Sequence, residues 1–219
     1  MKLRSGLMFA IVMTDSVESK QGKPDTKRAF RLMWARLGRK PGKKASLRML
    51  LDVEDLPGEG WRRLGESSWR TGTGGIRSDG LKRAREAGSI SAQRRFRRGD
   101  LQRMTIVIVP FASAADAKAL ETELRAGVIP YHPSKWKVAS ETIADYREGM
   151  LSLENPWAIE QRLEGTSGRA LRRVASGTID RFFIGVGSFS PDSRFTWEEI
   201  CAIADLQGTK VKRVKALDQ

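Results

Sequence analysis

The chain has 219 residues, of which 40% are hydrophobic and 30% are charged, a composition typical of a soluble globular protein with room for one domain of good size. The absence of a run of about 18 apolar residues excludes a conventional transmembrane helix, and the single cysteine, Cys201, excludes an internal disulfide framework and a multi-cysteine zinc site. The formal net charge of +14 is typical of proteins that bind nucleic acid, but the distribution of this charge is more informative than its total.

Positive charge is concentrated near the N-terminus. Residues 27–48 contain nine Lys or Arg and no acid, whereas residues 49–219 contain 27 basic and 23 acidic residues. We therefore predict a basic N-terminal arm over residues 1–46 and a single α+β domain over residues 47–219, which ends in a basic tail.

The arm is predicted to contain a basic amphipathic helix. Asp25 is a good N-cap for a helix over residues 26–37, and the segment GRKPGKKAS that follows has the composition of a charged, flexible linker. One side of the helix carries apolar residues such as Phe30 and Trp34, and the other side is basic. The candidate partner-binding residues of the arm are Lys27, Arg28, Arg31, Trp34, Arg36, Arg39, Lys40, Lys43 and Lys44.

The first residues resemble a secretory signal in part. Lys2 and Arg4 precede the apolar run GLMFAIVM, but TDSVES follows where a small-x-small cleavage site is expected. A buried strand, or a start codon placed too early, explains the run equally well. We expect a cytoplasmic location in preference to export.

The predicted domain opens with LRMLLDVEDLPGEGW. This segment predicts a short helix followed by a break before Trp61, and its acidic residues are expected to form local turn hydrogen bonds instead of a metal site. The polar, glycine-rich residues 61–80 are predicted to be irregular, and residues 81–87 to form one or two helical turns. The acidic residues concerned are Asp52, Glu54, Asp55 and Glu59.

The run LLDVEDLPGEGW, followed by SSWRTG, resembles the opening of uncharacterised actinobacterial domains that begin Leu-Leu-x3-Asp-Leu-Pro-x-Gly-Trp. Some of these domains resemble extracellular sensor or lipoprotein domains of the Mog1/PsbP-like type. The resemblance covers residues 49–72 and implies an antiparallel sheet flanked by helices, with a role in binding or sensing.

The segment from Ser89 predicts a β-hairpin, in which ISAQRRFRR pairs with the apolar strand LQRMTIVIVPF. In an extended strand Arg95 and Arg97 lie on one face, whereas Phe96 lies on the other. Interleaved basic and aromatic residues on a sheet suit single-stranded nucleic acid, although arginine also protects edge strands from aggregation. The alternative nucleic-acid surface therefore consists of Arg94, Arg95, Phe96, Arg97 and Arg98.

Three further elements are predicted after the hairpin. Ser113 and Asp116 have capping-box spacing at the start of a helix that ends at Gly127, and alternation from Trp157 to Glu164 predicts a half-buried strand. The segment TIDRFFIGVGSF is read as one covered strand. Thr196 caps a final helix that Gly208 is expected to end. Two strands and a helix thus occur twice, near 89–126 and 158–207, which predicts an α+β fold with helices packed on one side of an antiparallel sheet.

No motif in the sequence points to catalysis or to a cofactor. The glycine-rich TGTGG at 71–75 lacks the lysine of a phosphate loop, His132 has no recognisable nucleophile beside it, and Cys201 is expected to be a buried thiol. We expect a non-catalytic binding or sensing domain without a cofactor, whose arm docks on a partner, on a membrane surface or on its own domain. The alternatives are a nucleic-acid-associated protein and a homo-oligomer joined through the arm.

Overall fold

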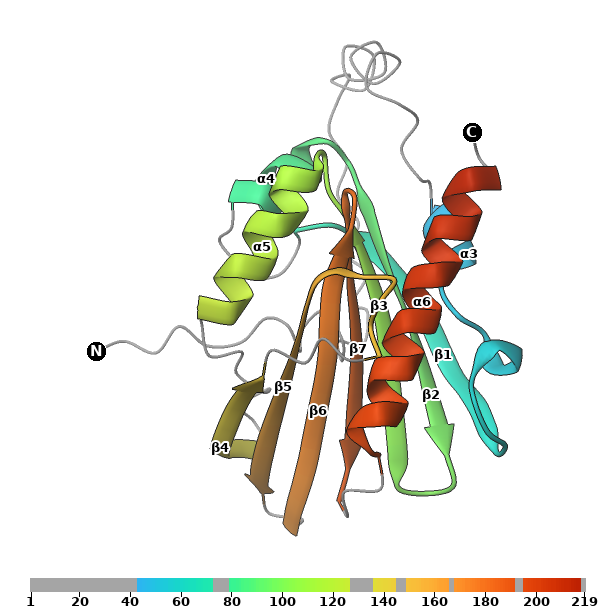
Figure 1. Ribbon diagram of the computed structural model, residues 1–219, viewed down its shortest axis with the longest axis vertical. Helices are drawn as coiled ribbons and strands as arrows, with labels where there is room; N and C mark the ends of the chain where they lie inside the picture. Colours follow the sequence, from blue (N-terminus) through green and yellow to red (C-terminus); the bar gives the residue numbers. More distant parts are fainter. Residues whose placement is uncertain are drawn as a thin grey trace, which may run out of the picture.

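The computed structural model describes residues 43–72, 79–126, 136–144, 149–165, 168–191 and 195–217. Seven antiparallel strands form one sheet in the order β1-β2-β3-β7-β6-β5-β4 (Figure 1). The strands are β1 (Trp61–Arg70), β2 (Ile90–Arg98), β3 (Gln102–Pro110), β4 (Trp136–Ala144), β5 (Glu154–Gly165), β6 (Gly168–Ile179) and β7 (Phe182–Ser190). The helices are α3 (Lys43–Arg48), the short 3-10 helix η1 (Val53–Asp55), α4 (Asp79–Glu86), α5 (Ala114–Ala126) and α6 (Trp197–Leu217). The predicted α+β class and antiparallel sheet are confirmed.

The helices divide between the two faces of the sheet, whereas the sequence suggested one side. Alternate residues of β3 belong to different apolar clusters: Ile106 and Ile108 pack with α6, and Val107 and Val109 pack with α4 and α5. We call these two surfaces the α6 face, which α3 also covers, and the α5 face. Because the central strands are apolar on both sides, each face needs its own cover.

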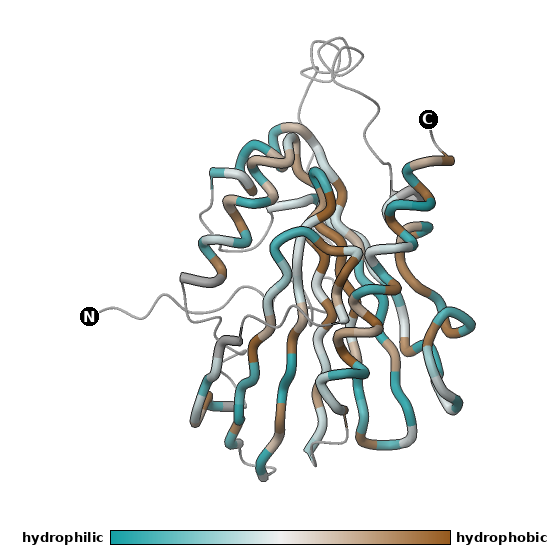
Figure 2. The backbone as a smooth tube through the Cα atoms, viewed as in Figure 1, coloured by the Kyte–Doolittle hydropathy of each residue, from teal (hydrophilic) through white to brown (hydrophobic). Residues whose placement is uncertain are grey.

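Hydrophobic residues are concentrated in the middle and upper parts of the central strands, as Figure 2 shows. The lower ends of the strands, near the β2–β3 turn, are mostly hydrophilic (Figure 2). Helix α5 packs near the upper end, because its buried Leu120 and Leu124 belong to the same cluster as Val109 and Phe183. At the other end, next to the β2–β3 turn, the α5 face carries the facing residues Arg97 and Arg103.

Strand β1 differs from the prediction of an irregular segment. It is an edge strand that pairs with β2 throughout, with a bulge between Arg63 and Gly65. Buried Trp61 and partly buried Trp69 lie on opposite faces, since the bulge changes the alternation between them. The bulge hides the period-2 pattern, which is why the sequence reads as irregular.

Two other predicted boundaries were wrong. The single strand predicted over TIDRFFIGVGSF is the end of β6, a turn at Asp180 with φ 50°, and β7. Helix α6 continues through Gly208 to Leu217 instead of ending there. Gly208 is needed for close packing, because a Cβ at this position would lie 2.2 Å from the Ser152 Oγ.

The predicted linker ends in ordered structure. Helix α3 begins at Lys43, and the buried Ser46 hydroxyl donates a hydrogen bond to the Ile90 carbonyl at 2.8 Å. The predicted arm helix over residues 26–37 lies outside the described residues. Within the described part of the chain, no helix is long and apolar enough to cross a membrane.

Candidate anion-binding face

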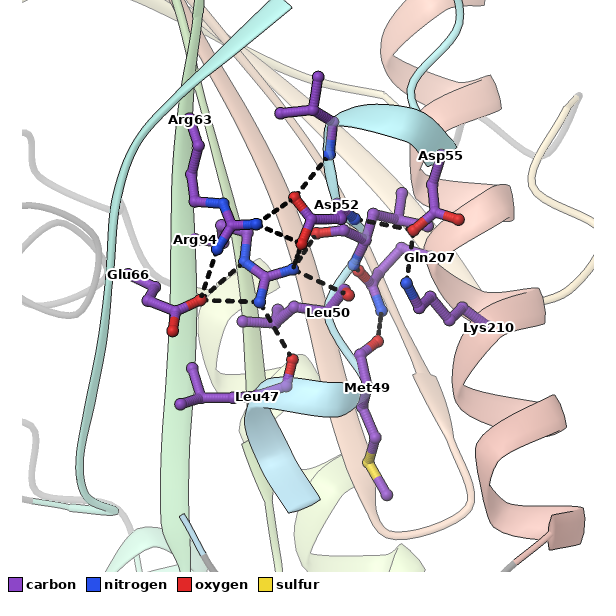
Figure 3. A network of polar contacts seen from close by, with 12 residues as sticks. Leu47, Met49, Leu50, Asp52, Asp55, Arg63, Glu66, Arg94, Gln207 and Lys210 are labelled. Atoms are coloured by element: carbon purple, nitrogen blue, oxygen red, sulfur yellow. Dashed lines mark hydrogen bonds and ion pairs between the residues drawn. The ribbon is translucent and has the colours of Figure 1, made fainter. Parts of the chain in front are cut away.

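Arg94 is the centre of a polar network on the α6 face (Figure 3). Its side chain is buried and forms ion pairs with Glu66 at 2.7 Å and Asp52 at 3.1 Å. It also donates hydrogen bonds to the carbonyl oxygens of Leu50 and Leu51, at 3.3 and 2.8 Å. Arg94 thus ties the segment after α3 to strand β2, which is a structural role.

Helix α6 holds the same segment from the other side. The Gln207 amide donates to the Met49 carbonyl at 2.6 Å and accepts from the Leu51 N–H at 2.9 Å, and Lys210 forms an ion pair with Asp55 (Figure 3). Asp52 and Asp55 also form the local turn hydrogen bonds that were predicted: the Asp52 carboxylate accepts the Val53 N–H and the Asp55 carboxylate accepts the Asp52 N–H, both at 2.8 Å. No group of three or more metal-ligating side chains occurs within the described ranges.

The environment of Asp52 lowers the pKa of its carboxyl group. Partial burial alone would raise this pKa, but the Val53 N–H and the guanidinium groups of Arg94 and Arg63 outweigh that effect. The pKa of Asp55 is lowered in the same way, because its contact with Lys210 outweighs its partial burial. Both carboxylates therefore stabilise the fold in their ionised form.

The other hairpin residues on the α6 face are also engaged. Phe96 is fully buried and packs edge-on against Trp61, with ring centroids 6.5 Å apart. Arg98 lies over the Trp61 ring, 4.8 Å from its centroid, and forms an ion pair with Glu199 at 2.6 Å. Of the five residues proposed as a nucleic-acid surface, Arg94, Phe96 and Arg98 thus have structural contacts, and no base can stack on Phe96.

Arginines on the opposite face of the same strands have a different environment. The strand register places Arg62 of β1 opposite Arg97 of β2, and Arg97 opposite Arg103 of β3. Arg95 lies two residues before Arg97, on the same face. We call these four residues the arginine strip: Arg62, Arg95, Arg97 and Arg103.

Acidic residues of the described ranges do not neutralise the arginine strip. Across the residues that the structure describes, no carboxylate forms an ion pair with any of its members. Arg62 and Arg103 are exposed, and Arg95 and Arg97 are partly exposed. Four arginines of the α6 face, in contrast, have acidic partners, in the pairs Arg63–Asp52, Arg94–Glu66, Arg98–Glu199 and Arg173–Glu160.

The row of Arg62, Arg97 and Arg103 continues across the sheet. Its next members are Phe189 on β7 and Arg172 on β6, followed by Gln161 on β5. Arg172 is buried, and its Nη1 donates to the Gln161 Oε1 at 2.5 Å. The hairpin end of the α5 face is therefore rich in hydrogen-bond donors.

Four buried polar atoms on this face lack a hydrogen-bond partner among the described residues. One is the Nε of Arg172, whose guanidinium donates to Gln161 through its Nη1; the other three are the Arg95 Nε, the Trp157 Nε1 and the Ser176 Oγ. Ser176 lies directly opposite Trp157 on one side and Gly185 on the other. Each of the four atoms can donate a hydrogen bond, and a buried donor without a partner lowers the stability of the protein.

The remaining predicted residues are placed as follows. Lys43 and Lys44 lie in α3, and the other arm candidates fall outside the described residues, as do His132 and residues 73–75 of the TGTGG segment. Cys201 is buried, as expected; burial, with a smaller effect of Glu198, raises the pKa of its thiol to about 11. The sequence prediction missed Arg62 and Arg103. The hairpin register could have identified Arg103, which lies six residues after Arg97.

Comparisons with known proteins give one distant structural likeness. No protein-family model and no curated protein matches the sequence. A crystal structure of the extracellular domain of PknH from Mycobacterium tuberculosis is similar, with 12% identity, a TM-score of 0.48, and coverage of 82% of this chain and 100% of that one. Because this domain is extracellular, the expected preference for a cytoplasmic location is contradicted, and we withdraw it.

Proposed function

We propose that this protein is a non-catalytic binding or sensing domain that holds an anionic ligand on the arginine strip of its α5 face. The observation that carries this proposal is the contrast between the two faces of β1, β2 and β3. Arginines of the α6 face have carboxylate partners, and those of the strip have none within the described part of the chain.

The strip reduces the stability of the ligand-free protein. Like charges directly opposite each other on antiparallel strands are destabilising, and Arg97 lies opposite an arginine on both sides. Residues that lower stability without serving the fold are typical of functional sites. An anion bound to the strip would relieve this repulsion, and the planar guanidinium group suits a carboxylate or a phosphate.

The alternative function, association with nucleic acid, has weaker support. It relied on an aromatic ring between arginines, but Phe96 is buried in the core. The hairpin then contributes Arg95 and Arg97 to such a surface, without a ring on which bases stack. The basic arm remains a proposed second contact for an anionic partner.

The proposal is tested with two variants that have the same net charge, one that loses three arginines of the strip and a control that loses three arginines elsewhere. Arg62, Arg97 and Arg103 are changed to Gln in one variant of the full chain, and the exposed Arg48, Arg85 and Arg213 are changed to Gln in the other. The probe is a fluorescein-labelled oligoglutamate, and binding is measured by fluorescence anisotropy at low and moderate salt.

We expect the strip variant to lose at least about tenfold more affinity than the control, which corresponds to roughly 1.4 kcal/mol. The salt dependence of binding should also be smaller for the strip variant, because fewer charge contacts remain. Equal losses in both variants would show that only the overall charge matters, and would refute the proposal.

A further inference from the structure

The arginine strip is a compact cluster of positive charge. Arg62, Arg97 and Arg103 lie opposite one another on three neighbouring strands, so roughly 10 Å separates the Cα atoms of the first and the last. Arg95 lies one row further from the β2–β3 turn, and its Cα is roughly 7 Å from that of Arg97. Because the guanidinium group of an arginine stands at the end of a long stem, all four groups can reach one small anion above Arg97.

The guanidinium group of Arg95 lies over strand β1. Its Nη2 is 3.6 Å from the position that a Cβ would occupy on Gly65, the residue opposite Arg95 in the strand register. Since Gly65 has no side chain, the guanidinium group lies against the strand itself. Arg95 thus brings its charge to the strand that carries Arg62, and its Nε has no hydrogen-bond partner within the described ranges.

Positive charge ends with the strip on strands β1, β2 and β3, all of which the structure describes in full. The row that contains Arg95 holds the uncharged Gly65 on one side and Thr105 on the other. At the outer end of the strip the chain carries acids, with Glu59 just before β1 and Asp100 in the β2–β3 turn. A long polyanion would need a longer track of positive charge, so the strip suits a compact anion of high charge.

We propose that the ligand held by the strip carries a phosphomonoester dianion. This inference rests on the proposed function and names the chemical class of its ligand. A phosphomonoester has a charge of about −1.5 to −2 at neutral pH and three acceptor oxygens, whereas a carboxylate has a single charge and two oxygens. Arg97 binds two of the oxygens as a fork, and Arg62 and Arg103 approach from the neighbouring strands. The dianion thus offsets more of the repulsion within the strip than a carboxylate does.

The charge of the ligand is tested by isothermal titration calorimetry of the full chain with phenyl phosphate and phenyl sulfate. Both probes carry a tetrahedral anion on the same ring, but the second pKa of a phosphomonoester is about 6, whereas the sulfate keeps a single charge. Between roughly pH 5 and pH 7.5 the dianion increases from about a tenth of the phenyl phosphate to nearly all of it. We therefore expect its affinity to rise about five- to tenfold over this range.

The affinity for phenyl sulfate should stay constant over the same range of pH. This probe is the control for titration of the protein itself, which includes Glu59 and Asp100 at the edge of the strip and the single histidine, His132. At neutral pH phenyl phosphate should bind at least about fivefold more tightly than phenyl sulfate, because it has the larger charge.

Two matched variants test whether the planar fork of Arg97 holds the phosphate. Arg97→Lys keeps the positive charge but removes the fork, and Arg213→Lys makes the same change at an exposed position outside the strip. Arg97→Lys should weaken binding of phenyl phosphate at least about fivefold, since a lysine cannot bind two oxygens in this way. Arg213→Lys should leave the affinity unchanged.

Two further probes separate the sources of such a group. Glycerol 3-phosphate is a free phosphomonoester, and dihexanoyl phosphatidic acid carries the same group as the headgroup of a short-chain lipid. Tighter binding of the lipid identifies a lipid headgroup as the ligand, and equal binding identifies a free phosphorylated molecule. Both results support the proposed class of ligand.

The inference is overturned if phenyl phosphate binds no more tightly than phenyl sulfate at neutral pH, or if its affinity does not change with pH. The proposed function still stands in that case, provided that the variant with Arg62, Arg97 and Arg103 changed to Gln loses its affinity for oligoglutamate. If neither phenyl phosphate nor oligoglutamate depends on the strip, both are wrong.

Discussion

Replacing Arg97 with Gln should stabilise the ligand-free protein, although it removes a residue from the middle of a strand. Arg97 lies opposite Arg62 on one side and Arg103 on the other, and it has no carboxylate partner within the described residues. Each like-charge pair costs roughly 0.2–1 kcal/mol, so the free energy of unfolding should rise by about 0.5–1.5 kcal/mol. Because the pairs are at least partly exposed, the gain should shrink as salt increases from roughly 0.01 M to 1 M.

The matched control is Arg94→Gln, which changes another arginine of the same strand. Here the substitution leaves the Asp52 and Glu66 carboxylates without their buried partner, so the free energy of unfolding should fall by about 3–5 kcal/mol. Both values are obtained from urea unfolding followed by circular dichroism. If Arg97→Gln destabilises the protein, or if its effect does not depend on salt, then repulsion among the arginines of the strip does not lower the stability of the protein, and the reasoning is refuted.

Three further predictions concern the α6 face. Because Asp52 and Asp55 have lowered pKa values, their contribution to stability is complete above the usual value near 3.8 and is lost as the pH falls through their folded pKa values. The urea midpoint of unfolding should therefore decrease on acidification, and Asp52→Asn should make this decrease smaller. Gly208→Ala should lower the free energy of unfolding by about 1–3 kcal/mol, because the new Cβ would meet the Ser152 Oγ. The same substitution within a helix usually stabilises a protein, so an increase in melting temperature would contradict this packing. Cys201, with a pKa of about 11 and a buried side chain, should react with a thiol reagent at neutral pH only as fast as the protein unfolds, and rapid labelling of the native state would disprove its burial.

The features that the sequence predicted best are local ones. The hairpin of β2 and β3 follows from an alternating strand, a short turn and an apolar strand, and the helix after Ser113 follows from a cap that the structure contains, with the Ser113 Oγ accepting the Asp116 N–H at 3.1 Å. The alternation also assigned Arg95 and Arg97 to one face and Phe96 to the other. Such patterns depend on neighbours within a few residues.

The features that the sequence could not predict depend on distant partners. Nothing near Arg94 indicates that Glu66 and Asp52 neutralise it, because β1 reads as irregular across its bulge. For the same reason Arg62 could not be placed opposite Arg97. Gly208 resembles a helix end in sequence, and only its close approach to Ser152 explains why a glycine stands within the helix.

The most direct test of the account is a nuclear magnetic resonance titration of the full chain with unlabelled oligoglutamate, which follows the arginine Nε–H signals. We expect the signals of Arg95, Arg97 and Arg103 to shift with a common dissociation constant, while those of Arg94 and Arg98, which are held by carboxylates, stay in place. Shifts confined to the arginines of the arm, or equal shifts on both faces of β2, would contradict the assignment of the α5 face as the ligand-binding surface.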